Sequence, residues 1–295
     1  QSRRPFPFII DNGVRRPLSR IRFLDSGGNS WYDGLQVSAR KRYSHGLVLT
    51  FAYTYSKTLM EGYGRNESDG INSNTFQNKY NRAAEKGRVG FDNRHVAVTS
   101  FVYDVPVPSF MASGVLGALF SGWQTNGIVT LRSGNPFTVS QGNVINTGNA
   151  PVRPDRVDSG KLDNRTVNQW FNPDAFRLVS CANAAIPEVC HYGNAGTGIL
   201  EGPAFKNVDF SAFKNFTITE RFRLQFRGEF YNLFNTPQFN VPNRTLNTQG
   251  GFLPQRAPSG SITYPTQANI TSGPGAITTL IAPMRNIQFG LKLLW

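Results

Sequence analysis

The chain has 295 residues, of which 39% are hydrophobic and 13% aromatic, and its formal net charge is +13. No uninterrupted apolar run reaches the roughly 20 residues that a transmembrane helix needs, so the class of helical membrane proteins is excluded. The cations lie at alternate positions along predicted strands without any nucleic-acid-binding motif, so no nucleic-acid partner is expected. The aromatic content, 29 glycines and 18 prolines are typical of an all-β, turn-rich protein.

The first ten residues, QSRRPFPFII, lack the basic and then apolar pattern of a secretory signal peptide. We therefore expect either a cytoplasmic chain or a mature or truncated one. A weak strand is predicted at 19–25, and segment 105–120 is interpreted as a connection with a single helical turn.

Regular alternation between apolar and polar residues predicts seven longer strands. They are 30–43, 47–56, 94–105, 122–133, 205–216, 221–235 and 285–295. Ordinary strands have about 5–6 residues, whereas a tilted strand that crosses a bilayer needs roughly 9–11. The connections alternate between short turns and long loops, as in bacterial outer-membrane barrels. The short turns are 44–46 and 217–220, and the long loops are 57–93, 134–204 and 236–284.

The stretch 221–230, RFRLQFRGEF, shows what the alternation implies. A soluble sheet would bury the apolar face in a core, whereas a membrane barrel would turn it to lipid and the charges to an aqueous lumen. Strand length and loop asymmetry favour the barrel. The residues expected to face lipid here and in the last strand are Phe222, Leu224, Phe226, Phe230, Ile287, Phe289, Leu291 and Leu293. Those expected to face the lumen are Arg40, Arg42, Gln124, Arg132, Arg223, Gln225, Arg227 and Glu229.

Aromatic residues and a few charges are expected near the strand ends, where a membrane meets water. The aromatic set comprises Trp31, Tyr43, Tyr53, Tyr55, Tyr103 and Trp123, and Tyr43 is assigned to the apolar face of its strand. Lys41 and Lys214 have apolar parity but adjoin short turns, so they can extend to the headgroups. We further predict a hairpin of 205–216 and 221–235, with Trp295 at the same end as the short turns.

The remaining chemistry-bearing residues do not form an enzyme site. Cys181 and Cys190 lie in a polar loop, where a disulfide is favoured over half of a zinc site, although His191 is adjacent. None of the three histidines has the spacing of a catalytic triad or a metal site, so no enzyme, metal or cofactor is expected. The glycine-rich stretch 193–198, GNAGTG, matches no phosphate-binding motif and is interpreted as a flexible loop.

The chain ends in QFGLKLLW, which resembles the assembly signal of outer-membrane barrels through Gln288, Gly290, Leu293 and Trp295. More broadly, the chain resembles the C-terminal barrel segment of TonB-dependent outer-membrane receptors, in particular the Oar-like group with a carboxypeptidase-regulatory-like domain. Four stretches carry the resemblance and together cover roughly a third of the chain. They are YDGLQVSARKRYSHGLVLTFAYTYSKTL, GWQTNGIVTLRSGNPFTV, GPAFKNVDFSAFKNFTITERFRLQFRGEFYNLFNTPQF and IQFGLKLLW.

The resemblance implies an active transporter in the bacterial outer membrane, energised by the TonB complex. Members of that family have a plug domain and a TonB box ahead of a barrel of about 22 strands. Here the plug, the TonB box and most of those strands have no counterpart, so residues 1–295 would be the C-terminal portion of one barrel domain. The implied partners are outer-membrane lipid, the barrel assembly machinery, the plug, the other barrel strands, the TonB complex and an unidentified substrate. The alternative is a free-standing small barrel with a structural or adhesive role.

Overall fold

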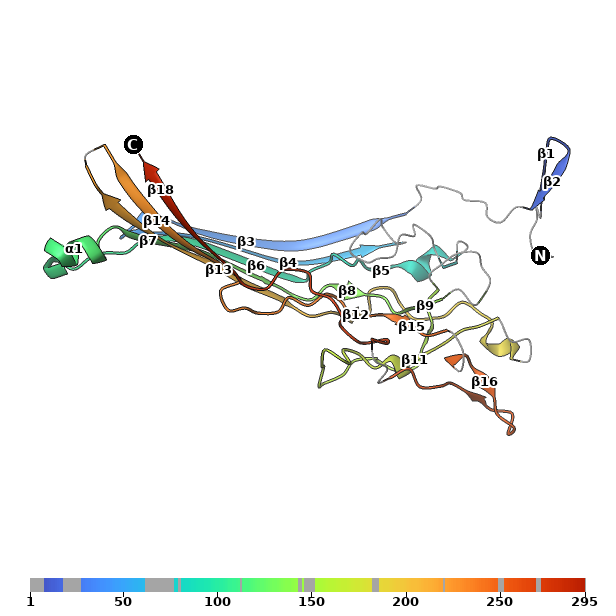
Figure 1. Ribbon diagram of the computed structural model, residues 1–295. Helices are drawn as coiled ribbons and strands as arrows, with labels where there is room; N and C mark the ends of the chain where they lie inside the picture. The colour runs from blue at the N-terminus through green and yellow to red at the C-terminus, as the bar shows by residue number, and fades with distance from the viewer. Residues whose placement is uncertain are drawn as a thin grey trace.

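The computed structural model describes residues 8–17, 28–61, 77–78, 81–111, 113–142, 145, 152–181, 186–219, 221–248, 252–268 and 272–294. Figure 1 shows a long curved sheet with a compact assembly of loops at one end and a small helix at the other. The weak strand predicted at 19–25 lies outside the described residues. Ahead of it, β1 (Phe8–Asp11) and β2 (Val14–Pro17) form a hairpin around Asn12 and Gly13, which both have positive φ.

All seven predicted strands are present. They are β3 (Ser30–Ser44), β4 (Leu47–Met60), β6 (His95–Asp104), β7 (Trp123–Arg132), β13 (Phe205–Thr217), β14 (Arg223–Tyr231) and β18 (Asn286–Leu294). Within the described residues they form one antiparallel sheet in the order β18-β14-β13-β7-β6-β4-β3, and the short β5 (Gly87–Arg88) pairs with β4. This sheet does not close into a barrel within the described residues.

The largest differences from the predicted strand boundaries are at the ends of β14 and β4. β14 ends at Tyr231 rather than near residue 235, because Asn232 and Asn235 adopt positive φ. The Asn232 side chain also accepts a hydrogen bond from the Thr236 backbone at 2.9 Å, which stabilises a turn. β4 continues to Met60, so the first long loop begins later than predicted.

The predicted hairpin between β13 and β14 is confirmed, and it closes through residues 218–222. Leu294 pairs with Arg223 beside this turn, so the end of β18 lies at the same end of the sheet as the short turns. Trp295 itself lies outside the described residues. The other turn, at His45 and Gly46, has positive φ at both positions, as a two-residue hairpin turn requires.

The strands are staggered as well as paired. One row of register partners starts at Lys41, near the end of β3, and ends at Ile287, the second residue of β18. Such a progressive shift is the shear that tilts strands in a barrel wall.

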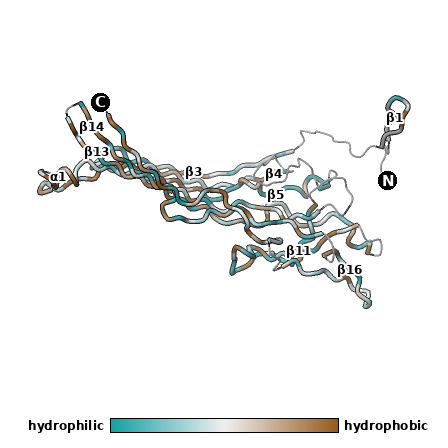
Figure 2. The backbone as a smooth tube through the Cα atoms, viewed as in Figure 1, coloured by the Kyte–Doolittle hydropathy of each residue, from teal (hydrophilic) through white to brown (hydrophobic). Residues whose placement is uncertain are grey.

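Residues that share a register row also share a face, and the two faces differ strongly in polarity. One face carries mainly aromatic and aliphatic side chains, and the rings of Phe226 and Phe289 lie 6.0 Å apart on it. Its charged residues lie towards the strand ends, as with Lys41, Lys214 and the opposed pair Asp33 and Lys57. Figure 2 shows the resulting mixture of hydrophobic and hydrophilic positions along the sheet.

The connection between β6 and β7 contains η3 (Ser109–Met111) and α1 (Gly114–Phe120), more helix than the single turn predicted. Val115 is 77% exposed, and Leu116, Leu119 and Phe120 are exposed as well. The Trp123 indole donates to the Leu119 carbonyl at 2.9 Å, and the Lys214 ammonium donates to the Ser121 carbonyl. Both contacts fix α1 to the apolar face of the sheet.

At the opposite end, the described parts of 77–94, 133–204 and 232–285 fold together into a unit that we call the cap (Figure 1). Its short elements are η2 (Arg82–Glu85), β8 (Pro136–Phe137), β9 (Ser140–Gln141), β10 (Asp155–Arg156), η4 (Pro173–Ala175), β11 (Phe176–Arg177), η5 (Pro187–Val189), β12 (Leu200–Glu201), β15 (Thr245–Leu246), β16 (Gln255–Arg256) and β17 (Ile262–Thr263). Its hydrophobic core includes Phe137, Val139, Phe171, Phe176 and Leu246, each at most 3% exposed. The long loops are therefore a packed structure rather than independent surface segments.

Candidate ligand-binding cavity

A cavity of about 930 Å³ lies where the cap meets the loop ends of the strands. Lys57 and Leu59 of β4 line one part of it, and the segments 133–137, 156–171 and 197–204 line much of the rest. Two of these segments are continuations of wall strands, because β8 follows β7 and β12 precedes β13, and β8 pairs with β12. The cavity is thus attached directly to the sheet.

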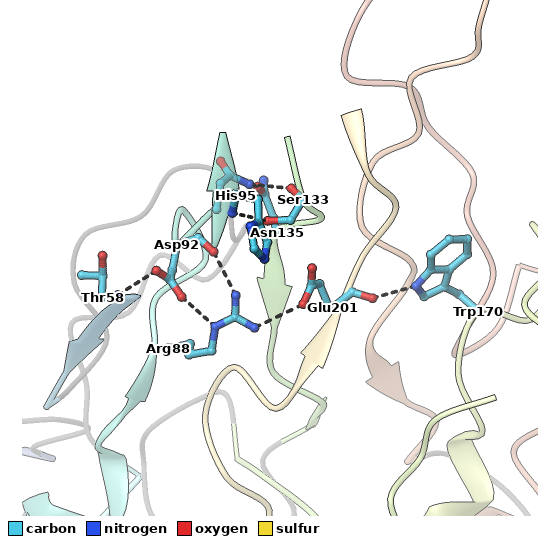
Figure 3. Close-up of polar contacts among 9 residues, drawn as sticks. Thr58, Arg88, Asp92, His95, Ser133, Asn135, Trp170 and Glu201 are labelled. Atoms are coloured by element: carbon cyan, nitrogen blue, oxygen red, sulfur yellow. Dashed lines mark hydrogen bonds and ion pairs between the residues drawn. The ribbon is translucent and has the colours of Figure 1, made fainter. Parts of the chain in front are cut away.

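Arg88 links three parts of the cavity wall (Figure 3). Its Nε lies 2.6 Å from Asp92 Oδ2, and its Nη1 lies 3.3 Å from Glu201 Oε2. Asp92 also accepts from the Thr58 backbone at 2.7 Å, and the Trp170 indole donates to the Glu201 carbonyl at 2.8 Å. Asp92 is buried, and its negative charge is balanced by the neighbouring Arg88 guanidinium. These contacts hold β4, the first long loop and the second long loop in one arrangement.

Glycines allow these loops to approach each other closely. A Cβ on Gly198, whose φ is +62°, would collide with the Arg88 carbonyl, and a Cβ on Gly87 would collide with the Thr197 carbonyl. Gly193 and Gly198 are both buried. The interpretation of 193–198 as a flexible loop is therefore wrong, because this stretch is packed into the cap and lines the cavity through Thr197 and Gly198.

A second polar connection lies deeper in the cap. The Arg153 guanidinium forms an ion pair with Glu85, and the two side chains are 5% and 1% exposed. Arg153 Nε also donates to the Ala195 carbonyl at 2.7 Å, and its backbone N–H donates to Gln77 Oε1 at 2.6 Å. The first loop is therefore fixed to the second through a buried, hydrogen-bonded charge pair.

The cavity lining is strongly basic. Among the described residues its cations are Lys57, Arg88, Arg94, Arg156, Lys161 and Arg165, and Glu201 is the one acidic residue that lines it. Trp170, Phe171, Leu59 and Ile199 add apolar surface. Arg165 lies over the Trp170 ring, with its guanidinium carbon 5.5 Å from the ring centroid. Chemically, such a site can hold a small molecule by charge and by contact with apolar groups.

The polar residues predicted from the sequence lie elsewhere, on the sheet. Gln225 donates to Asn215 at 2.9 Å and accepts from Arg227 at 2.6 Å, and the guanidinium of Arg227 lies over the Phe213 ring. Gln124 and Arg227 both pair with Phe213 in the register, so they lie on the same face of the sheet. Arg223, Gln225 and Glu229 alternate with the apolar residues of β14 and lie on that face too. Arg40 and Arg132 are on this face too.

Two face assignments in β3 do not follow from the strand pairing. That of Arg42 is not tested by it, and that of Tyr43 is wrong. A register irregularity between Lys41 and Ser44 interrupts the alternation, and Arg42 has no partner within it. Tyr43 was assigned to the apolar face, but its hydroxyl donates at 3.0 Å to Asp104, the carboxylate that also accepts from Gln124 on the polar face. The local bulge explains why strict alternation fails at this position.

The cavity residues could not be identified from the sequence, because they come from five separate segments without a shared motif. The glycine-rich stretch 193–198 was the one local signal. Among the described residues no group of three or more His, Cys, Asp or Glu side chains is placed to hold a metal ion.

The structure joins Cys181 and Cys190 in a disulfide. His191 turns to Asp155 instead, with Nε2 2.6 Å from Oδ2. Nearby, a backbone hydrogen bond and the Arg256 guanidinium hold the pKa of the exposed Glu188 below its ordinary value.

Taken together, a tilted antiparallel sheet with one apolar and one polar face, short turns at one end and a folded cap at the other define a membrane barrel wall. No helix in the described part of the chain has the length and apolar character to cross a bilayer. The chain belongs to the outer membrane beta barrel domain family, whose model matches residues 1–288. The protein is therefore located in the bacterial outer membrane. Neither the curated proteins nor the solved structures contain a match to this chain.

Proposed function

We propose that this chain is part of the wall and outer mouth of a TonB-dependent transporter of the Oar-like group. The observation that carries the proposal is the cap: a folded unit with its own core and a cavity of about 930 Å³, built on the wall strands at the end opposite the short turns. A barrel with a purely structural role has no need of a lined cavity at its mouth.

The sheet supports the same proposal. Within the described residues β3 and β18 have no outer partner strand, and the exposed side chains along both suit a sector of a larger barrel. In that barrel the polar face, with Arg40, Gln124, Arg132, Arg223, Gln225, Arg227 and Glu229, lines the lumen. It provides hydrogen-bonding groups for a plug domain, while the apolar face contacts lipid.

Single-channel recording in planar bilayers tests this proposal. The intact receptor should be closed, because a plug fills the lumen, whereas a variant without its plug should conduct as a large open pore. A free-standing small barrel, the alternative, would have a lumen filled by side chains and no large conductance in either form. Binding of the periplasmic domain of TonB to the intact receptor is the second expected result, and its absence would contradict the energy source that we propose.

A further inference from the structure

Two buried polar atoms in the described part of the chain lack a hydrogen-bond partner, Arg94 Nε and Thr197 Oγ1. Both residues line the same cavity. A buried donor without an acceptor costs free energy, so such atoms usually have a partner in the functional state. Both groups can donate, and both residues line the cavity, so an acceptor held there would complete their hydrogen bonding.

The charges of the lining point to the same kind of partner. Arg88 is already neutralised by Asp92 and Glu201. Arg94 and Lys161, by contrast, have no ion-pair partner within the described ranges, while Lys57 lies opposite Asp33 across β3 and β4. Glu201 is the one carboxylate among the described lining residues, and because it contacts Arg88, it leaves Arg94 and Lys161 uncompensated. A cavity with this charge attracts anions and repels cations.

The geometry points to an anionic small molecule with an apolar body as the ligand of this cavity. We infer that Arg94 and Thr197 donate to its acidic group, that Lys57 and Lys161 supply further positive charge, and that Trp170 contacts its apolar part. The volume suits one small ligand. This inference rests on the proposed transport function, because it names the class of substrate that the same cap would admit.

Carboxylate, phosphate and sulfonate groups share the chemistry that the cavity offers, namely negative oxygens that accept charge-assisted hydrogen bonds. The probe is pyrenetetrasulfonate, a fluorescent polyanion with a flat apolar ring system. It is titrated into the protein, folded in a neutral detergent, at constant ionic strength, and binding is followed by fluorescence anisotropy. A pyrenyl ammonium compound serves as the probe of opposite charge.

We expect saturable binding of the anionic probe and none of the cationic one. Arg94→Gln should weaken binding by about tenfold or more, and Thr197→Val, which keeps the side-chain shape, by about threefold. The matched control is Arg177→Gln, an exposed cap cation outside the cavity whose guanidinium lies over the Tyr264 ring. It should leave the affinity unchanged. Competition with citrate and with pyrophosphate then identifies the preferred acidic group.

The inference is overturned if Arg94→Gln and the unaltered protein bind the probe equally, if the ammonium probe binds as tightly, or if neither citrate nor pyrophosphate displaces the probe better than chloride of equal ionic strength. If Arg94→Gln does not fold, Thr197→Val and Lys57→Gln provide the same test. Binding needs neither a plug nor TonB, so its failure is distinguishable from failure of the conductance experiment.

Discussion

At the scale of single residues, the buried pair of Arg153 and Glu85 has the largest expected effect on the cap. Both side chains are nearly inaccessible to water, so removing one charge leaves the other buried and unpaired. Glu85→Gln should therefore destabilise the cap by about 3–5 kcal/mol. Hydrogen exchange of the cap amides measures the effect as a loss of protection.

The control for this substitution is Glu188→Gln. Glu188 pairs with Arg256 at 2.8 Å, but the two side chains are 56% and 37% exposed, so water screens the interaction. Exchange in this variant should be close to that of the unaltered protein. Equal loss of protection in both variants would show that burial does not determine the strength of these pairs.

Two features make Gly198 hard to replace, namely its positive φ and the closeness of the Arg88 carbonyl. Gly198 and Gly260 both have positive φ, but a Cβ meets nothing within 4 Å at Gly260, whereas at Gly198 it meets the Arg88 carbonyl. Alanine in the left-handed region costs about 1–2 kcal/mol at either position. Gly198→Ala should therefore destabilise the cap more than Gly260→Ala, as measured by the rate of limited proteolysis.

At the scale of the strand, the two faces of β6 can be compared at neighbouring positions. Phe101 lies on the apolar face at mid-strand, beside Leu49 and Gly127 in the register, whereas Ser100 lies on the polar face beside Thr50 and Ile128. If the apolar face contacts lipid, Phe101→Arg should cost about 2–4 kcal/mol of folding free energy in lipid vesicles. Urea titration of folding into vesicles is the measurement.

Ser100→Arg introduces the same side chain one residue away and should be tolerated, because the polar face is directed away from lipid. The reverse pattern, with Phe101→Arg folding normally and Ser100→Arg failing to insert, would mean that the faces are assigned backwards. A soluble sheet would then be the better interpretation.

The strands could be predicted from the sequence because alternation is a local signal that follows directly from backbone geometry. The face on which Tyr43 lies could not be predicted, because the bulge between Lys41 and Ser44 shifts the alternation without a local sequence cue. The hairpin at Asn12 and Gly13 does carry a local cue, the Asn-Gly dipeptide typical of a two-residue turn. The cavity depends on contacts between residues such as Arg88 and Glu201, far apart in sequence, which no local pattern encodes.

At the scale of the whole molecule, the protein has two differently stabilised parts. The sheet depends on lipid at its apolar face, whereas the cap has a water-excluding core around Phe137 and Phe171. In lipid vesicles urea should therefore unfold the cap before the sheet. Fluorescence of Trp170, with the other tryptophans replaced by Phe, reports on the cap, and far-ultraviolet circular dichroism reports on the sheet.

In that experiment Glu85→Gln should move the fluorescence transition to lower urea and leave the dichroism transition in place. A single shared transition for both signals would contradict the division into two parts, because it would mean that cap and wall unfold as one cooperative unit.

Within the described residues the outer edges of β3 and β18 have no partner strand, and this constrains the order of events during biogenesis. Each edge presents a row of backbone N–H and C=O groups, and every such group costs several kcal/mol when it enters hydrocarbon without a partner. The sheet therefore cannot enter the bilayer first and find its neighbours afterwards. Edge pairing and insertion have to proceed together. The cap is free of this constraint, so its folding can precede or follow insertion.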